Sequence, residues 1–237
     1  MLKAFVRTKN GKFPDVNYYL AAEGFENLGY TVTLFEENDD SQITKSSPVF
    51  TGHSGFRKIL DKLGVSYSFD CYPDELSQFY GREIRRSTIA SVVASKELGK
   101  FIKPVLQKQF GSCVLNKGNF QFLNPAYKIV PQDAEIYVSD AINIISEFRA
   151  YVHSGEIIAV KHYRKEWNKI PDEFFMENAV KQYTPCPIAY GIDFAVTEDG
   201  KTVVLEVNDA CNLGNYGIDS ALYAEMIISR WEEITRR

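Results

Sequence analysis

Residues 191–208, with the sequence GIDFAVTEDGKTVVLEVN, predict a β-hairpin. Apolar residues alternate with polar or small ones on both sides of a Glu-Asp-Gly-Lys turn, which is the pattern of two strands that bury one face. A turn of this length places Asp193 opposite Glu206, with Asn208 two residues further along the same face. Val204 is expected on that face as well. The hairpin therefore predicts two facing carboxylates.

Two like charges that face each other across a strand pair repel, and a cation between them removes the conflict. Magnesium binds carboxylate and amide oxygens and leaves positions for phosphate oxygens. Asp193, Glu206 and Asn208 are therefore candidate metal ligands. Without metal, one carboxyl is expected to titrate with a raised pKa, and Glu206→Gln is expected to relieve repulsion. The alternative is a solvated hairpin face that carries two ordinary surface acids.

The composition indicates an ordinary globular protein. With 237 residues, 45% of them hydrophobic, the chain can bury a sizeable core. A net charge of -4 gives no overall attraction to nucleic acid or to anionic membranes, and no apolar run is long enough to span a bilayer. The four cysteines have neither a disulfide nor a zinc spacing. We expect a cytoplasmic protein with no membrane partner, for which nucleic acid is an unlikely partner.

Local patterns predict mixed α and β structure. Residues 2–6 and 31–35 are expected as strands around a helix at residues 16–28, which is the start of an open α/β layer. Residues 75–98 are expected to be helical throughout, and an amphipathic helix is expected from Ser220 onward.

A turn of small residues at 51–55, TGHSG, precedes a helix expected at residues 56–63. Such a turn can offer backbone amides to an anion. A plain connection between a strand and a helix is the favoured interpretation, because a turn with two glycines is a weak signal.

Three basic residues lie in expected strands. Lys103 lies in an apolar strand, where a lone charge is costly unless it is paired or meets a ligand; the alternative is an edge strand from which the side chain reaches water. Arg149 shares a strand face with Glu147, and a structural pair between them is the alternative to a phosphate contact. Lys161 ends the next strand as a second candidate cation or as a surface lysine.

Three segments in a fixed order resemble the ATP-grasp superfamily. Residues 203–208 (VVLEVN) are similar to its terminal metal-binding motif, residues 101–104 (FIKP) to the strand whose lysine contacts ATP, and residues 146–152 (SEFRAYV) to the strand after the adenine hinge. The resemblance covers roughly residues 80–216. No single motif is decisive, but their joint order is fairly specific.

The resemblance implies an α+β fold in which two lobes hold ATP between them. It implies an N-terminal α/β region at residues 1–75 and an ATP-grasp core at residues 76–237. Within the core, the small lobe would span about residues 76–135 and the large lobe about residues 136–237.

The resemblance also implies roles for individual residues, with ATP and Mg²⁺ as cofactors. Arg149 and Lys161 would neutralise the transferred phosphate, while Asp193, Glu206 and Asn208 would hold the metal. Residues 135–138 resemble the hinge between the lobes, where Val138 would offer backbone groups to adenine and Asp140 would contact the ribose; a helix cap explains Asp140 equally well. The implied nucleotide contacts are Lys103, Glu135, Val138, Asp140 and Glu147.

The expected activity is an ATP- and Mg²⁺-dependent ligation, in which a substrate carboxylate becomes an acyl phosphate and is captured by an amine. A phosphotransferase and a non-catalytic nucleotide-binding regulatory protein are the alternatives. The loop at residues 209–217 departs from the commonest pattern of the family, so the carboxylate and the amine, small molecules or peptides, stay open. Cys211 has no histidine in a positioned relation to it, so an inert thiol is the stronger interpretation.

Overall fold

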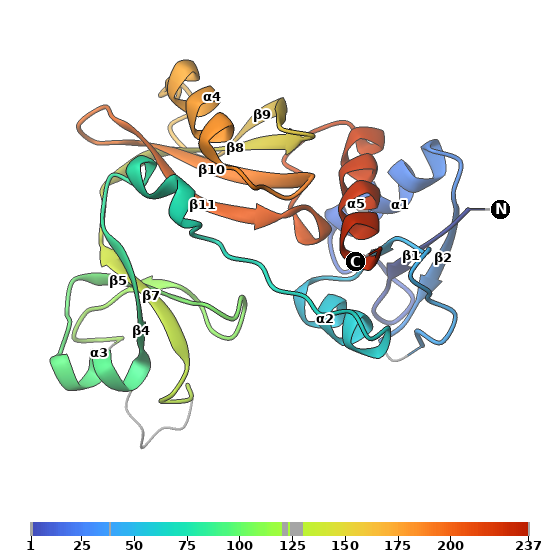
Figure 1. The fold of residues 1–237 in the computed structure, drawn as a ribbon, viewed down its shortest axis with the longest axis horizontal. Coiled ribbons are helices and arrows are strands. Elements are labelled where there is room, and N and C mark those ends of the chain that lie inside the picture. Colours follow the sequence, from blue (N-terminus) through green and yellow to red (C-terminus); the bar gives the residue numbers. More distant parts are fainter. Residues whose placement is uncertain (1, 38, 120–122, 124–129, 237) are drawn as a thin grey trace.

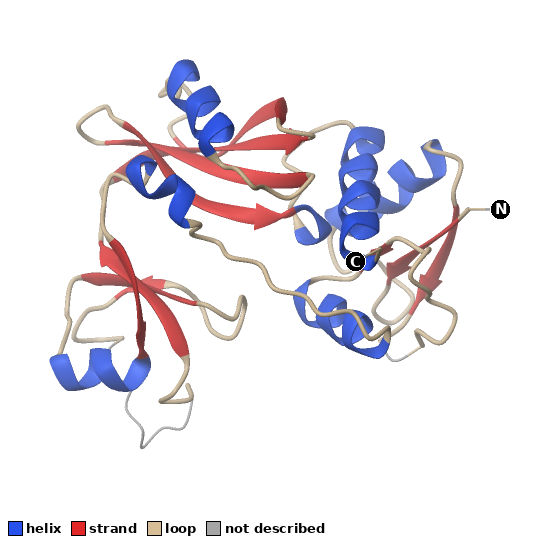
Figure 2. Ribbon diagram, viewed as in Figure 1, coloured by secondary structure: helices blue, strands red, loops and turns tan. Residues whose placement is uncertain are grey.

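The computed structural model describes residues 2–37, 39–119, 123 and 130–236. It contains three sheets, connected by helices and loops (Figures 1 and 2). The mixture of helices and sheets confirms the expected fold class.

The first sheet belongs to the N-terminal α/β region. Strands β1 (Lys3–Arg7), β2 (Thr31–Phe35) and β3 (Val49–Phe50) are parallel in the order β2-β1-β3, and helices α1 (Val16–Asn27) and α2 (His53–Lys62) accompany them. These elements confirm the expected strands and the expected helix between them.

The C-terminal helix α5 (Ser220–Thr235) packs on α1, so the two ends of the chain share one core (Figure 1). At Gly24 of α1 the two backbones approach so closely that an added Cβ would lie 1.9 Å from the Ser220 carbonyl oxygen. Only glycine allows this contact.

The large sheet is antiparallel and carries the predicted hairpin. Its order is β11-β10-β8-β9, and helix α4 (Glu173–Gln182) covers one of its faces. Its strands are β8 (Ile144–His153), β9 (Glu156–Lys165), β10 (Ala189–Thr197) and β11 (Thr202–Asp209). The α4 face is apolar, whereas part of the other face is charged and turns toward the small sheet.

The small sheet has the order β4-β7-β5-β6 and packs against α3 (Ile89–Ser95). Its strands are β4 (Ile84–Thr88), β5 (Lys100–Pro104), β6 (Cys113–Val114) and β7 (Glu135–Asp140). Strand β7, at the lobe boundary expected near residue 136, pairs within this sheet on both of its edges. The division of the chain into domains stays a prediction.

The helix expected over residues 75–98 is wrong. This segment forms a 3-10 helix (Asp74–Phe79), strand β4 and helix α3. Gly81 has φ +64°, outside the helical region, and an added Cβ there would lie 2.6 Å from Val203 Cγ1. Pairing of β4 with β7 then overrides the helical pattern of residues 84–88.

Candidate active site

The hairpin register confirms the predicted carboxylate pair. Asp193 of β10 lies opposite Glu206 of β11, and Asn208 lies opposite Gly191. The reason differs from the expected one. Near the turn, Val196 pairs with Thr202, one residue out of the expected register, and a bulge beyond Asp193 restores the pairing.

The same bulge corrects the expected position of Val204. This side chain is fully buried, in the core cluster that includes Phe194 and Val207, and does not share a face with Glu206. Leu205 is the extra residue that shifts the alternation. The bulge therefore keeps both carboxylates on one face and the apolar residues on the other.

A row of charged residues crosses the large sheet. Asp193 lies opposite Arg149 of β8, which in turn lies opposite Lys161 of β9. With Glu206, the row contains two acids followed by two bases. Arg149 grips Asp193 with both ends of its guanidinium, Nε to Oδ1 and Nη2 to Oδ2, each at 2.7 Å. Asn208 Nδ2 donates to Asp193 Oδ2 at 3.1 Å and to Glu206 Oε1 at 3.3 Å.

Lys103 connects the small sheet to this row. It lies on β5, and its Nζ forms an ion pair with Glu206 Oε2 and stands 5.3 Å from the centre of the Tyr72 ring. Burial disfavours the Lys103 ammonium, but the Glu206 carboxylate outweighs that effect and raises the Lys103 pKa. Lys103 is therefore positively charged and faces the carboxylates across the boundary between the two sheets.

The two carboxyls differ in their titration. Burial raises the pKa of Asp193 and outweighs the opposing effect of Arg149, in the direction expected for one member of the pair. Burial acts in the same direction on Glu206, but Lys103 and Asn208 together lower the pKa of Glu206. Cations of the protein thus neutralise both acids, and the expected repulsion between unpaired charges does not apply.

Two connected cavities border the row. A cavity of about 420 Å³ is lined by six of the predicted site residues: Lys103, Glu147, Arg149, Asp193, Glu206 and Asn208. A neighbouring cavity of about 350 Å³ is lined by Asp140 and by the loop at residues 141–142, together with Phe101 and Leu205. Both cavities include Glu147, Asp193 and Glu206, so they meet at the carboxylates.

Three predicted site residues lie outside the linings of these cavities. Glu135 is exposed near the far end of β7 from Asp140, and Lys161 lies next to Arg149 in the sheet but lines neither cavity. Val138 is 1% exposed on an inner strand that pairs on both edges, so its backbone groups are used within the sheet. The hinge backbone at the cavity follows β7, at residues 140–142.

The surroundings of Asp140 and Glu147 exclude two alternatives. No helix follows Asp140 in the described chain, since β8 begins at Ile144, and Asp140 Oδ1 instead accepts a 2.5 Å contact from Lys100. Glu147 does not pair with Arg149; its Oε1 lies 3.4 Å from Arg164.

Sequence reasoning missed two tyrosines at the site. Tyr163 and Tyr216 stack with ring centres 4.6 Å apart, and the Arg149 guanidinium lies 4.9 Å from the Tyr216 ring and 5.9 Å from the Tyr163 ring. Alternation along β9 carried a signal for Tyr163, which lies two residues beyond Lys161. Tyr216 reaches the site through the loop after β11 and had no local signal.

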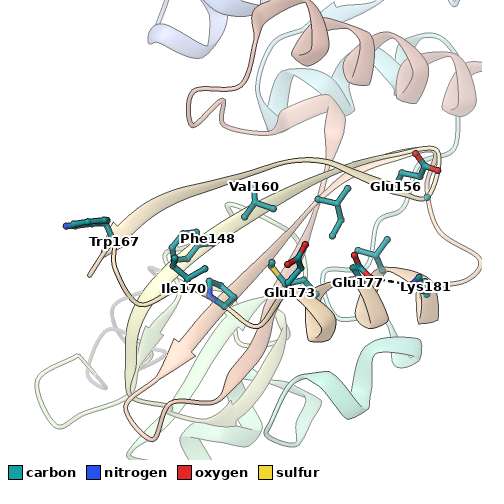
Figure 3. Close-up of a pocket in the computed structure, with 13 residues that line it drawn as sticks. Phe148, Glu156, Val160, Trp167, Ile170, Glu173, Glu177 and Lys181 are labelled. Carbon is teal, nitrogen blue, oxygen red and sulfur yellow. Dashed lines mark hydrogen bonds and ion pairs between the residues drawn. The ribbon is translucent and has the colours of Figure 1, made fainter.

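A groove of about 660 Å³ lies on the opposite face of the large sheet, between β9 and α4 (Figure 3). Phe148 lines it, whereas the next residue, Arg149, points to the other face. Trp167 and Ile170 also line it and are more than 70% exposed. None of the predicted site residues lines this groove.

The donor set at the hairpin suits Mg²⁺. Asp193 and Glu206 offer carboxylate oxygens and Asn208 an amide oxygen, all hard ligands. In the described part of the chain, no group of three or more His, Cys, Asp or Glu residues could hold a metal. The site therefore leaves room for ligands from outside the protein, such as phosphate oxygens.

Two lobes with carboxylates and cations at their boundary define a nucleotide-binding enzyme of the ATP-grasp type. A family model for the ATP-grasp domain, the second family of its clade, matches residues 79–226. The chain belongs to the ATP-grasp family. Membership confirms the expected fold and an ATP-dependent ligase with ATP and Mg²⁺ as its cofactors.

Solved structures show the same fold. A D-alanine–D-alanine ligase from Bacillus anthracis complexed with ATP is 14% identical, with TM-score 0.61 and coverage of 99% of this chain and 98% of the other. A D-cycloserine synthetase is 13% identical, with TM-score 0.60 and coverage of 96% and 99%. The ATP-grasp ligase PsnB complexed with minimal precursor is 13% identical, with TM-score 0.51 and coverage of 95% and 98%. No curated protein matches.

Proposed function

We propose that the chain activates a substrate carboxylate as an acyl phosphate and transfers the acyl group to an amine. The observation that carries this proposal is the junction of two cavities at one charged wall. Lys103 comes to that wall from the small sheet, and Arg149, Asp193 and Glu206 come from the large sheet. A nucleotide can lie in one cavity with its phosphates at the wall, and a carboxylate can reach the same wall from the other.

The 350 Å³ cavity is the proposed nucleotide site. Phe101 and Leu205 give it apolar walls for a base, and the backbone at residues 140–142 borders it. Asp140 is placed near the ribose, paired with Lys100. This arrangement moves the proposed adenine contact from Val138 to the residues that follow β7.

The carboxylates and cations are proposed to divide the work at the phosphates. Mg²⁺, when bound, neutralises phosphate charge, and Asp193, Glu206 and Asn208 are the residues that would hold it. Lys103 supplies a point charge and Arg149 a planar fork for the transferred phosphate. Glu206 and Lys103 pair in the ligand-free protein, so nucleotide binding would exchange this internal ion pair for contacts to the ligand.

The proposed reaction needs positioning and charge neutralisation more than a dedicated base. A carboxylate oxygen of the substrate bonds to the γ-phosphorus while the bond to the β–γ bridging oxygen breaks, and ADP leaves. The amine nitrogen then bonds to the acyl carbon, inorganic phosphate leaves and the amine proton passes to solvent. The names of the similar structures, two ligases and a synthetase, support this class of reaction.

Hydroxylamine trapping tests the proposal before the natural amine is known. The protein is incubated with Mg-ATP, hydroxylamine and pools of amino acids and peptides, and ADP and hydroxamate are measured together. The proposal expects equal amounts of both with one pool. ADP release with a stable phosphorylated product and no hydroxamate would instead assign a phosphotransferase.

A cytoplasmic location is part of the proposal. The four cysteines are free, with Cys71 and Cys211 buried, which suits a reducing compartment. None of the helices in the described residues is long and apolar enough to cross a membrane.

A further inference from the structure

A third cavity, of about 680 Å³, continues from the charged wall toward the N-terminal α/β region. It shares His53, Gln107, Lys108, Asn212, Gly214 and Tyr216 with the 420 Å³ cavity. It shares no lining residue with the proposed nucleotide site. A substrate that reaches the wall can therefore extend into this cavity, away from ATP.

The lining of this cavity is strongly cationic. Arg7, Arg57 and Lys108 line it, and Asp15 is its one acidic lining residue among the residues described. Asp15 already caps helix α1, since its Oδ1 accepts a 2.8 Å hydrogen bond from the Asn17 backbone. Arg57 and Lys108 have no carboxylate within ion-pair distance in the described chain, and the nearest one to Arg7 is Glu37, at 3.6 Å.

His53 reports the same positive environment. Burial, followed by the charges of Lys108 and Arg57, lowers the pKa of His53 to about 4. At neutral pH the ring is therefore uncharged and can donate or accept a hydrogen bond. The positive charge in the cavity comes from residues that cannot lose it at this pH.

Helix α2 adds backbone donors at the same place. Its first turn begins at His53 after Gly52, which has φ +78° and no side chain to cap the helix. An added Cβ at Gly52 would lie 2.8 Å from the Tyr18 hydroxyl, so this position needs glycine. Gly52, His53 and Ser54 all line the cavity, so free backbone N–H groups of the helix N-terminus lie at its wall.

Buried polar atoms without partners gather around the cavity. Arg7 Nε, Thr51 Oγ1 and Asn212 Oδ1 have no hydrogen-bond partner among the described residues, and all three side chains line this cavity. Thr51 is 1% exposed. A buried polar group costs free energy unless a partner satisfies it. A bound polar ligand would provide such partners.

We propose that this cavity binds a second anionic group of the substrate, a carboxylate or a phosphate, remote from the carboxylate that is activated. The inference rests on the proposed function, because the reacting carboxylate defines which group is the second one. Arg57 and Arg7 bind the oxyanion from the side, and the first turn of α2 binds it through backbone N–H groups. The substrate class is thus a carboxylic acid that carries a further negative charge.

Thermal melting with Mg-AMPPNP at saturation tests this inference. Glutarate and inorganic phosphate are added separately as probes, with glutaramide and sodium chloride at matched ionic strength as controls. At about ten times its dissociation constant, a bound probe should raise the Tm of the parent protein by about 2–5 °C. Protection by glutarate alone indicates a carboxylate, and protection by phosphate alone indicates a phosphate.

Two variants on α2 locate the effect. Arg57→Gln should abolish protection by the probe, whereas Lys58→Gln, which removes the same charge from an exposed neighbour that pairs with Glu37, should keep it. Equal protection of the parent and Arg57→Gln, or no protection by either probe, would overturn the inference. A Tm shift with Mg-AMPPNP alone keeps the proposed function intact in either case, whereas no shift with the nucleotide refutes that function directly.

Discussion

Arg149 holds Asp193 through two parallel hydrogen bonds of 2.7 Å, and both residues are almost completely buried. The pair crosses from β8 to β10 in register, so the sheet itself sets its geometry. Arg149 Nη1 makes no hydrogen bond to any described residue and is the part of the guanidinium left for a ligand. The arginine is thus oriented before any phosphate arrives.

Arg149→Lys keeps the charge and loses the fork. Lysine can reach Asp193 with one group only, so the free energy of unfolding should fall by about 1–3 kcal/mol, the usual range for a hydrogen bond to a charged group. ADP release should fall roughly 100-fold, as when one preorganised donor is removed. Urea unfolding and ADP release measure the two effects.

Arg164→Lys is the matched control. Arg164 is exposed and pairs with Glu147 at 3.4 Å, so its stability change should stay within about 0.5 kcal/mol. Turnover of Arg149→Lys equal to that of this control would remove Arg149 from the reaction.

Glu206→Gln should destabilise the ligand-free protein. The sequence suggested relief of repulsion, but the structure shows that Glu206 is the partner of Lys103, which is 12% exposed. Glutamine would leave a largely buried ammonium without its counter-charge, at a cost of about 3 kcal/mol. ADP release should be abolished, because a candidate metal ligand is lost.

A double-mutant cycle separates the pair from its surroundings. Glu206→Gln combined with Lys103→Met removes both charges and should recover most of the stability lost by Glu206→Gln alone. Additive losses in urea unfolding would show that Lys103 and Glu206 do not stabilise each other.

His53 should make stability depend on pH. The unfolded side chain is protonated below its ordinary pKa of 6.5, whereas the folded side chain stays neutral to about pH 4, because of burial and the charges of Lys108 and Arg57. The unfolded state therefore binds more protons between these values. The free energy of unfolding should fall by about 2–3 kcal/mol as the pH decreases across this window.

His53→Asn removes the titrating group and should flatten this part of the profile. Urea unfolding at several pH values compares the two proteins. Parallel profiles would mean that His53 is not held neutral in the folded state.

The sequence predicts much of the site because strand alternation is local. The facing of Asp193 and Glu206 and the shared face with Asn208 follow from a period of two along β10 and β11. The bulge at Leu205 has no comparable local signal, since it depends on the packing of Val204 in the core.

Contacts between distant segments were harder to predict. Pairing with β7 decides the conformation of residues 84–88, and β7 lies about fifty residues later in the chain. Lys103 was predicted from its apolar strand, but its partner Glu206 lies on another sheet. Tyr216 reaches Arg149 only because the loop after β11 returns to the site. Each of these depends on tertiary packing, which overrides local propensity.

Calorimetric titration of Mg-AMPPNP into Lys103→Met tests the central claim most directly, which is that the charged wall between the two sheets holds the phosphates of ATP. Methionine keeps the length of the side chain and removes its charge, so affinity should fall about 10- to 100-fold, the equivalent of one charge-assisted contact. Lys201→Met removes an exposed lysine that pairs with Asp199 at the hairpin turn, and it should bind as the parent does. Equal affinity of Lys103→Met, Lys201→Met and the parent, with all three folded, would contradict the account.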